Sequence, residues 1–216
     1  MKVAVLSESP ADEAAIRVFV DGLLREQTES CQRPRSPSGG KDAVFGSLPS
    51  VLTYVHYRTD ADALCVVVDS DLSPVHDPSH EQPDKLNLKC RLCKLRSIVT
   101  TVQNALRPVP GRPAIKTAIG LAVPQIEAWY LAGRDPHVNE ALWNQFLSAA
   151  LPRYRREDLK VKVYGIDRPL LAQAIECARK EAERIVRDGH LPLLEKLFPV
   201  GFGAFASDVR AWRTQG

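Results

Sequence analysis

The sequence predicts an α/β fold in which helices cover both faces of a parallel sheet, with a helical C-terminal extension. Three observations predict it. The apolar runs 3–6 and 64–68 have the composition of strands that are buried on both faces. Segments with helical periodicity separate the predicted strands, as parallel strands require. After residue 137 only helical patterns follow.

The first strand leads directly into a helix. Ser9 suits the N-cap, Pro10 suits the first helical position, and the apolar residues that follow recur at helical spacing. The stretch 28–46 is rich in Pro, Gly, Ser and basic residues, so we expect a mobile basic loop there. A helix over 47–58 then leads to the second strand, which ends directly at Asp-Ser-Asp, residues 69–71.

A polar loop over 73–86 precedes a long predicted helix that Pro108 ends. Its apolar residues are spaced four and three apart, which is a strong amphipathic pattern. They are Leu88, Leu92, Leu95, Val99, Val102 and Leu106. A third strand over 115–122 leads into a segment whose later part should be helical. Further helices are expected over 138–150, 168–188, 191–197 and 204–213, with a basic connector, 153–162, between the first two.

The composition is that of an ordinary globular protein, with 44% hydrophobic and 25% charged residues. The net charge of +3 is compatible with a nucleic-acid partner but does not require one. No apolar stretch approaches the roughly 20 residues that span a bilayer, so no membrane association is expected. Five cysteines, an odd number, argue against a secreted disulfide framework and favour the reducing cytoplasm.

Acidic residues follow the ends of all three predicted strands. Glu8 comes just after the first strand, Asp69 and Asp71 end the second, and Glu127 lies a few residues beyond the third. Because the carboxyl ends of parallel strands meet at one edge of a sheet, we expect these carboxylates to converge. Such a cluster repels itself unless it holds a divalent cation, and oxygen ligands select Mg²⁺ or Mn²⁺. The sequence therefore predicts a magnesium site.

Each of these residues also has an ordinary structural interpretation. Glu8 could be a turn or cap residue, the Asp-x-Asp pair could be turn chemistry, and Glu127 could be a solvated helix residue. Their joint placement after three strands favours one shared site.

Three segments carry a resemblance. They are Leu6-Ser7-Glu8-Ser9-Pro10-Ala11-Asp12, Val67-Val68-Asp69-Ser70-Asp71 and Pro124-Gln125-Ile126-Glu127-Ala128-Trp129-Tyr130-Leu131-Ala132. The first two resemble the TOPRIM superfamily, found in topoisomerases, primases, small maturation nucleases and overcoming-lysogenization-defect nucleases. Its pattern is a strand ending in Glu-Gly, an Asp in the following helix, and a strand ending in Asp-x-Asp. The third is similar to the Pro-x-Ile-Glu-Ala-Trp segment of a TOPRIM-like bacterial family, often encoded beside an ABC-type ATPase.

The resemblance implies a TOPRIM-like catalytic domain over 1–135 and a helical extension over 136–216. It implies a Mg²⁺-dependent nuclease that hydrolyses phosphodiester bonds in DNA or RNA. Glu8 would be the general base or a metal ligand, Asp69 and Asp71 would bind Mg²⁺, and Glu127 would complete a second metal site. The candidates for holding the scissile phosphate are Lys94, Arg96 and Lys116.

This sequence departs from the family at two points. Ser9 stands where the family has Gly, which restricts how closely the backbone approaches a phosphate. The tyrosine and additional large domain of a topoisomerase are not evident, so strand passage is not implied. The resemblance also implies a setting, a bacterial defence system in which a partner ATPase controls the nuclease. An oligomer is compatible with the sequence.

Two other functions compete with the nuclease. The first is a non-catalytic regulatory or binding subunit that has the same fold. The second is a flavodoxin-like or receiver-like signalling domain, which needs a lysine at the end of a strand. Lys116 falls at the start of its strand, which disfavours that class.

A second metal group is suggested by His76, His80, Cys90 and Cys93, because Cys-x-x-Cys is a common spacing of zinc ligands. The competing interpretation is that the two cysteines are simply neighbours inside the long helix and the histidines lie in a solvated loop. The basic stretches 33–41 and 153–162 could follow a nucleic-acid backbone or be solvated loops.

Overall fold

Four parallel strands form the sheet in the described part of this computed structural model, which covers residues 1–32, 40–81, 89–149 and 156–213. They are β1 (Lys2–Leu6), β2 (Glu29–Ser30), β3 (Ala63–Asp69) and β4 (Lys116–Ala122), paired in the order β2-β1-β3-β4. The register sets Leu6 opposite Val66 and Asp69 opposite Ala122. The carboxyl ends of β1, β3 and β4 therefore share one edge, and the predicted α/β fold class is confirmed.

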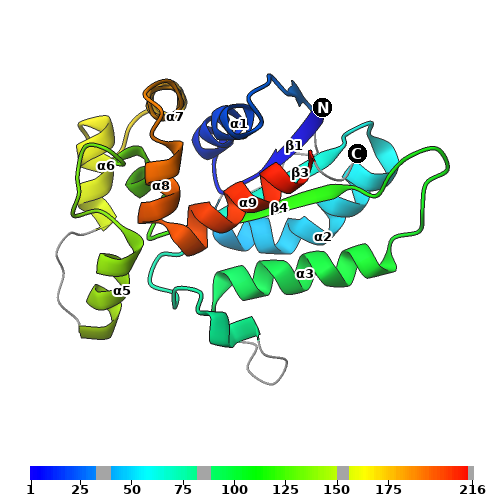
Figure 1. Cartoon of the computed structure of the whole chain (residues 1–216), viewed down its shortest axis with the longest axis horizontal. Helices are drawn as coiled ribbons and strands as arrows, with labels where there is room; N and C mark the ends of the chain where they lie inside the picture. The colour runs from blue at the N-terminus through cyan, green and yellow to red at the C-terminus, as the bar shows by residue number, and fades with distance from the viewer. Residues whose placement is uncertain (33–39, 82–88, 150–155, 214–216) are drawn as a thin grey trace.

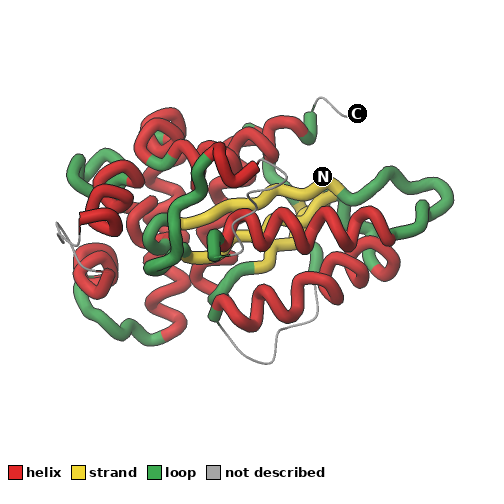
Figure 2. Tube along the Cα trace, turned by 90° about the horizontal axis from the view of Figure 1, so that it is seen from below, coloured by secondary structure: helices red, strands yellow, loops and turns green. Residues whose placement is uncertain are grey.

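Helices cover both faces of this sheet (Figures 1 and 2). The helices α1 (Pro10–Leu24) and α9 (Ala204–Ala211) pack on one face, and α2 (Lys41–Arg58) and α3 (Arg91–Ala105) pack on the other. The chain moves outward from β1 to β2 through α1 and then returns past β1 to β3 through α2. Right-handed crossovers consequently place α1 and α2 on opposite faces. The direction of winding changes between β1 and β3, which is where α/β folds generally bind ligands.

The start of α1 agrees with its sequence signals. The Ser9 hydroxyl accepts a hydrogen bond from the Asp12 backbone N–H at 3.2 Å, and Pro10 occupies the first helical position. Ile16, Phe19 and other apolar residues of the predicted face are buried. This local geometry fixes where Glu8, just before the cap, and Asp12, in the first turn, lie relative to β1.

The prediction of a basic loop over 28–46 is wrong at both ends of that range. Glu29 and Ser30 form β2, which pairs with Lys2 and Val3, because a two-residue edge strand needs only backbone hydrogen bonds. The helix α2 begins at Lys41, six residues earlier than expected, following Gly40 with φ at 86°. Residues 33–39 lie outside the described ranges.

The C-terminal part is helical, as predicted, and its apolar residues belong to the same core as those of the sheet. It contains α5 (Glu140–Ala149), α6 (Arg156–Tyr164), α7 (Leu171–Arg187), α8 (Leu191–Leu197), a π-helical turn η3 (Pro199–Gly203) and α9. The helix α7 packs along α1, and α9 packs on β4. The apolar residues of both parts form a single core cluster.

Part of the expected basic connector is itself a helix. Within 153–162, residues from Arg156 onward belong to α6, where Leu159 and Val163 are buried four positions apart. This helix was not predicted from the sequence, because its many basic side chains leave only a narrow apolar stripe. None of the helices in the described ranges has the length and apolar composition that crossing a membrane requires.

Candidate functional site

Hydrogen bonds around Asp69 tie together the carboxyl ends of two strands. Glu8, just after β1, accepts a hydrogen bond through Oε1 from the Asp69 backbone N–H at 2.9 Å. Asp69 Oδ1 in turn accepts one from the backbone N–H of Ile126 at 3.0 Å, at the start of α4 (Ile126–Tyr130). Glu127, the next residue, is buried. The structure thus brings the predicted acidic residues to one edge of the sheet.

Asp71 lies at the rim of this edge and is paired with two cations. Its carboxylate contacts the Arg91 guanidinium at 2.7 Å and the Lys41 ammonium at 3.5 Å. Arg91 also donates to the backbone carbonyl of Asp69. The Asp71 backbone adopts a left-handed φ of 49°, a region that Asp tolerates better than most residues. Its backbone N–H donates a hydrogen bond to the carbonyl oxygen of Pro124 at 2.8 Å.

Asp12 is a member of the cluster that was not included among the predicted site residues. It follows Glu8 by four positions in the first turn of α1, and its charge acts on Asp69. The signal was present in the sequence, because the cap at Ser9 starts a helix directly after Glu8 and puts Asp12 in its first turn. Lys160, in α6, lies near enough to lower the pKa of Asp12 slightly.

The carboxylates repel one another strongly. The pKa of Asp69 is well above its ordinary value because of burial and the charges of Asp12, Glu8, Glu127 and Asp71. Burial and the Glu127 charge raise the pKa of Asp12 to about 7. Burial, with the Asp71 charge, also raises that of Glu8. A divalent cation would relieve this repulsion, so the donor set fits a hard metal ion.

Two tyrosines lie beside the carboxylates. Tyr164, in α6, donates a hydrogen bond to Glu127, and burial together with the nearby carboxylates raises its pKa far above the ordinary value. The Tyr130 hydroxyl is buried beside the same carboxylates and has no hydrogen-bond partner among the described residues. A buried hydroxyl is normally paired, which fits a water or ligand oxygen bound within the cluster.

The residues predicted to hold a phosphate are not those that reach the carboxylates. Lys116 begins β4 and donates to Trp212 O at 2.6 Å. It therefore lies at the amino end of the strands, away from the carboxylates, and its predicted role in holding the phosphate is wrong. The Lys94 ammonium lies 4.4 Å from the Phe45 ring centroid. Arg96 contacts His76. The cations at the acidic rim are instead Arg91 and Lys41.

The basic stretches contribute to the site through single residues. Lys41 is the last residue of the stretch 33–41 and contacts Asp71, and Lys160 belongs to 153–162 and lies near Asp12. Residues 33–39 and 150–155 fall outside the described ranges.

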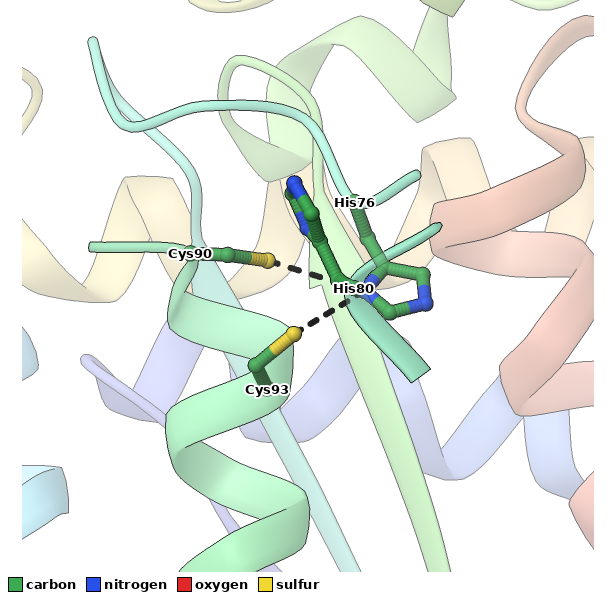
Figure 3. A group of neighbouring side chains, drawn as sticks. All are labelled: His76, His80, Cys90 and Cys93. Atoms are coloured by element: carbon green, nitrogen blue, oxygen red, sulfur yellow. Dashed lines mark hydrogen bonds between the residues drawn. The ribbon is translucent and has the colours of Figure 1, made fainter. Parts of the chain in front are cut away.

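The four predicted zinc ligands come together in a second group, referred to here as the His/Cys group (Figure 3). One ligand atom from each of His76, His80, Cys90 and Cys93 lies within 4.8 Å of the others, so the group could hold a metal ion. The helix α3 starts at Arg91, later than predicted. Cys90 is therefore the N-cap and not an interior residue, and His80 belongs to the 3₁₀ turn η1 (Pro78–Glu81).

Comparisons of the chain with protein-family models, with curated proteins and with solved structures found no match. The resemblance to TOPRIM proteins therefore stays a prediction. Within the described ranges, the acidic cluster and the His/Cys group are the two features of the structure that bear on function.

Proposed function

We propose that this protein is a Mg²⁺-dependent nuclease that hydrolyses phosphodiester bonds in DNA or RNA. The observation that supports it most is the convergence of five carboxylates at the carboxyl edge of the sheet. They are Glu8, Asp12, Asp69, Asp71 and Glu127. Self-repelling carboxylates with two cations at their rim suit a site that holds a metal ion and a phosphate together.

Glu8, Asp69, Asp71 and Glu127 would hold the metal through carboxylate oxygens, and Mn²⁺ could replace Mg²⁺. When bound, the ion supplies Lewis-acid chemistry that makes a water more acidic and offsets charge on the phosphoryl transition state. Oxygen donors distinguish this site from the His/Cys group, whose sulfur and nitrogen donors select zinc.

Residues of the chain would perform the remaining tasks. Arg91, fixed by Asp69 O and the Asp71 carboxylate, provides a guanidinium suited to a phosphate at the rim. Lys41, the more exposed of the two cations, provides a second positive charge. Asp12, whose charge interacts with those of Asp69 and Glu127, would add a fifth carboxylate beside the metal.

Cleavage assays with the purified protein test this proposal. We expect plasmid DNA, single-stranded DNA or RNA to be cut with Mg²⁺ or Mn²⁺ and not with EDTA. Glu8→Gln and Asp69→Asn should reduce the rate by roughly 10²-fold or more. Asp42→Asn is the matched control, since it removes one exposed carboxylate next to Lys41 but outside the cluster. Equal rates in Asp69→Asn and Asp42→Asn would contradict the proposal.

One observation favours a second function, a non-catalytic subunit that uses the acidic edge only for binding. Asp71 is already paired with Arg91, so a metal ion must compete with a guanidinium for its oxygens. Titration calorimetry distinguishes the two functions. Mg²⁺ binding that Asp69→Asn abolishes, without cleavage of any substrate by the wild type, would support the binding subunit.

The cellular setting is proposed from the sequence resemblance alone. It is a bacterial defence system in which a partner ATPase controls the nuclease. We also propose a reducing compartment such as the cytoplasm, because all five cysteines are free thiols. Co-purification of a tagged chain with an ATPase from its native host would test the partner.

A further inference from the structure

Two distances within the His/Cys group are close to those of a tetrahedral metal centre (Figure 3). His76 Nδ1 lies 3.2 Å from Cys93 Sγ and 3.7 Å from Cys90 Sγ. Zinc bonds of about 2.3 Å to sulfur and about 2.0 Å to nitrogen place neighbouring ligand atoms roughly 3.3–3.8 Å apart. The ring of His80 lies beside that of His76, with centroids 5.5 Å apart, and supplies the fourth ligand atom.

The local fold gives these side chains their positions. Cys90 caps α3 and Cys93 lies in its first turn, so a spacing of three residues puts both sulfurs on one side of the helix start. The amino end of a helix also favours thiolates, which are the form that binds metals. Cys90, Cys93 and His76 are buried, while His80 is partly exposed and closes the group from outside.

Thiol packing alone explains this arrangement poorly. Both sulfurs face the same imidazole nitrogen, and one nitrogen lone pair accepts only one good S–H hydrogen bond. A metal ion would satisfy both sulfurs and both rings together. Two sulfur and two nitrogen donors are a ligand set of structural zinc sites.

We propose that His76, His80, Cys90 and Cys93 bind one zinc ion, which fixes the start of α3 and thereby holds Arg91 at the acidic edge. Binding would release one proton from each thiol, giving two thiolates and two neutral imidazoles around the ion. Arg96 lies 3.5 Å from His76 Nε2, at the limit of a hydrogen bond. That nitrogen carries a proton when Nδ1 binds zinc, so Arg96 would turn from it toward Asp208, on whose carboxyl group its charge already acts.

The link to the acidic edge is Arg91, which lies between the two cysteines in the sequence. Its guanidinium contacts Asp71 and the backbone carbonyl of Asp69. Because Cys90 and Cys93 flank it within one helical turn, an ion bound to both would restrain the backbone that carries Arg91. Zinc binding itself does not depend on whether the protein is a nuclease, so this inference can hold if that proposal fails.

Metal content and cobalt spectroscopy test the zinc site. Full-length protein reconstituted with Zn²⁺ under reducing conditions should retain about one zinc per chain after gel filtration. Replacing zinc with Co²⁺ should give the visible absorption of a tetrahedral ion and a near-ultraviolet thiolate-to-cobalt band. Cys90→Ser and Cys93→Ser should weaken both, whereas Cys177→Ser, in α7, should not. The wild-type cobalt spectrum keeps the test decisive if the serine variants fail to fold.

Absence of retained zinc and of a thiolate-to-cobalt band in the folded wild type would overturn the site. Hydrogen exchange tests the positioning of Arg91. Zinc should slow amide exchange at least several-fold in peptides covering 89–95 and leave peptides from α7 unchanged. Zinc that binds without this protection would overturn the positioning role while leaving the site itself supported.

Discussion

The backbone N–H of Asp69 donates a hydrogen bond to Glu8 Oε1 at 2.9 Å, joining the ends of β1 and β3. The bond partly offsets the effect of burial on the Glu8 pKa, whereas Asp69 itself is surrounded by other carboxylates. The two acids therefore contribute differently to the stability of the metal-free protein.

Asp69→Asn should stabilise the protein in the absence of metal. Asn keeps an acceptor for the Ile126 N–H and removes the charge that the neighbouring carboxylates repel. In EDTA at about pH 8, we expect the free energy of unfolding to rise by about 1–2 kcal/mol. Urea denaturation measures it, and Mg²⁺ affinity measured by calorimetry should fall at least about tenfold. A loss of stability in EDTA would show that the cluster is not self-repelling.

The stability of the metal-free protein should fall as the pH rises toward neutrality. The pKa of Asp12 is about 7 in the folded protein, against an ordinary value of 3.8. A carboxyl whose pKa is raised by folding stabilises the fold below its unfolded pKa, and that contribution is lost as the pH rises through the folded pKa. The Tm in EDTA should therefore be higher near about pH 5 than near about pH 8.

Mg²⁺ should restore the Tm at the higher pH, because it binds the ionised carboxylates. Asp12→Asn should flatten the profile measured in EDTA. A profile in EDTA that is equally steep in the wild type and in this variant would contradict the prediction.

Glu140 should produce a second pH dependence that Mg²⁺ does not alter. Its carboxylate accepts hydrogen bonds from the N–H groups of Val200 and Gly201 at 3.2 and 3.3 Å, and burial raises its pKa to about 7 from 4.5. As for Asp12, the raised pKa of Glu140 stabilises the folded protein below about pH 4.5, by up to roughly 3 kcal/mol, and this stabilisation is lost as the pH rises through about 7. Glu140→Gln keeps an acceptor and should remove this slope in urea titrations, with or without Mg²⁺.

Gly201→Ala should destabilise the protein strongly. A Cβ at Gly201 would lie 2.1 Å from the backbone oxygen of Leu121 in β4, too close for any adjustment of a side chain to relieve. We expect a loss of at least about 2 kcal/mol in urea denaturation. Gly46→Ala is the control, because nothing lies within 4 Å of a Cβ in that exposed position of α2. It should raise stability by about 0.5–1 kcal/mol.

Much of the fold could be predicted because its signals are local. The apolar run before Asp69 is long enough to define β3, and the cap at Ser9 fixes the start of α1. The strand-end rule then placed Glu8, Asp69 and Asp71 at one edge without knowledge of strand order. The two-residue strand β2 has no such signal, because its pairing with β1 is made by backbone groups alone.

The cations of the site could not be predicted in the same way. Arg91 reaches Asp71 only because the start of α3 lies beside the end of β3. Lys41 does so only because α2 begins earlier than its composition indicates. Lys116 is different. Its position at the start of a strand was visible in the sequence, and the strand-end rule already excluded it from the acidic edge.

Both ends of the described chain lie together at one end of the sheet (Figure 1). There β1 begins at Lys2, and Trp212 O accepts a hydrogen bond from Lys116 at the start of β4. The acidic cluster lies at the other end of these strands. An affinity tag, a fluorophore or a surface anchor joined to either end would therefore lie away from the carboxylate edge, so immobilised protein would still present that edge to metal ions in solution.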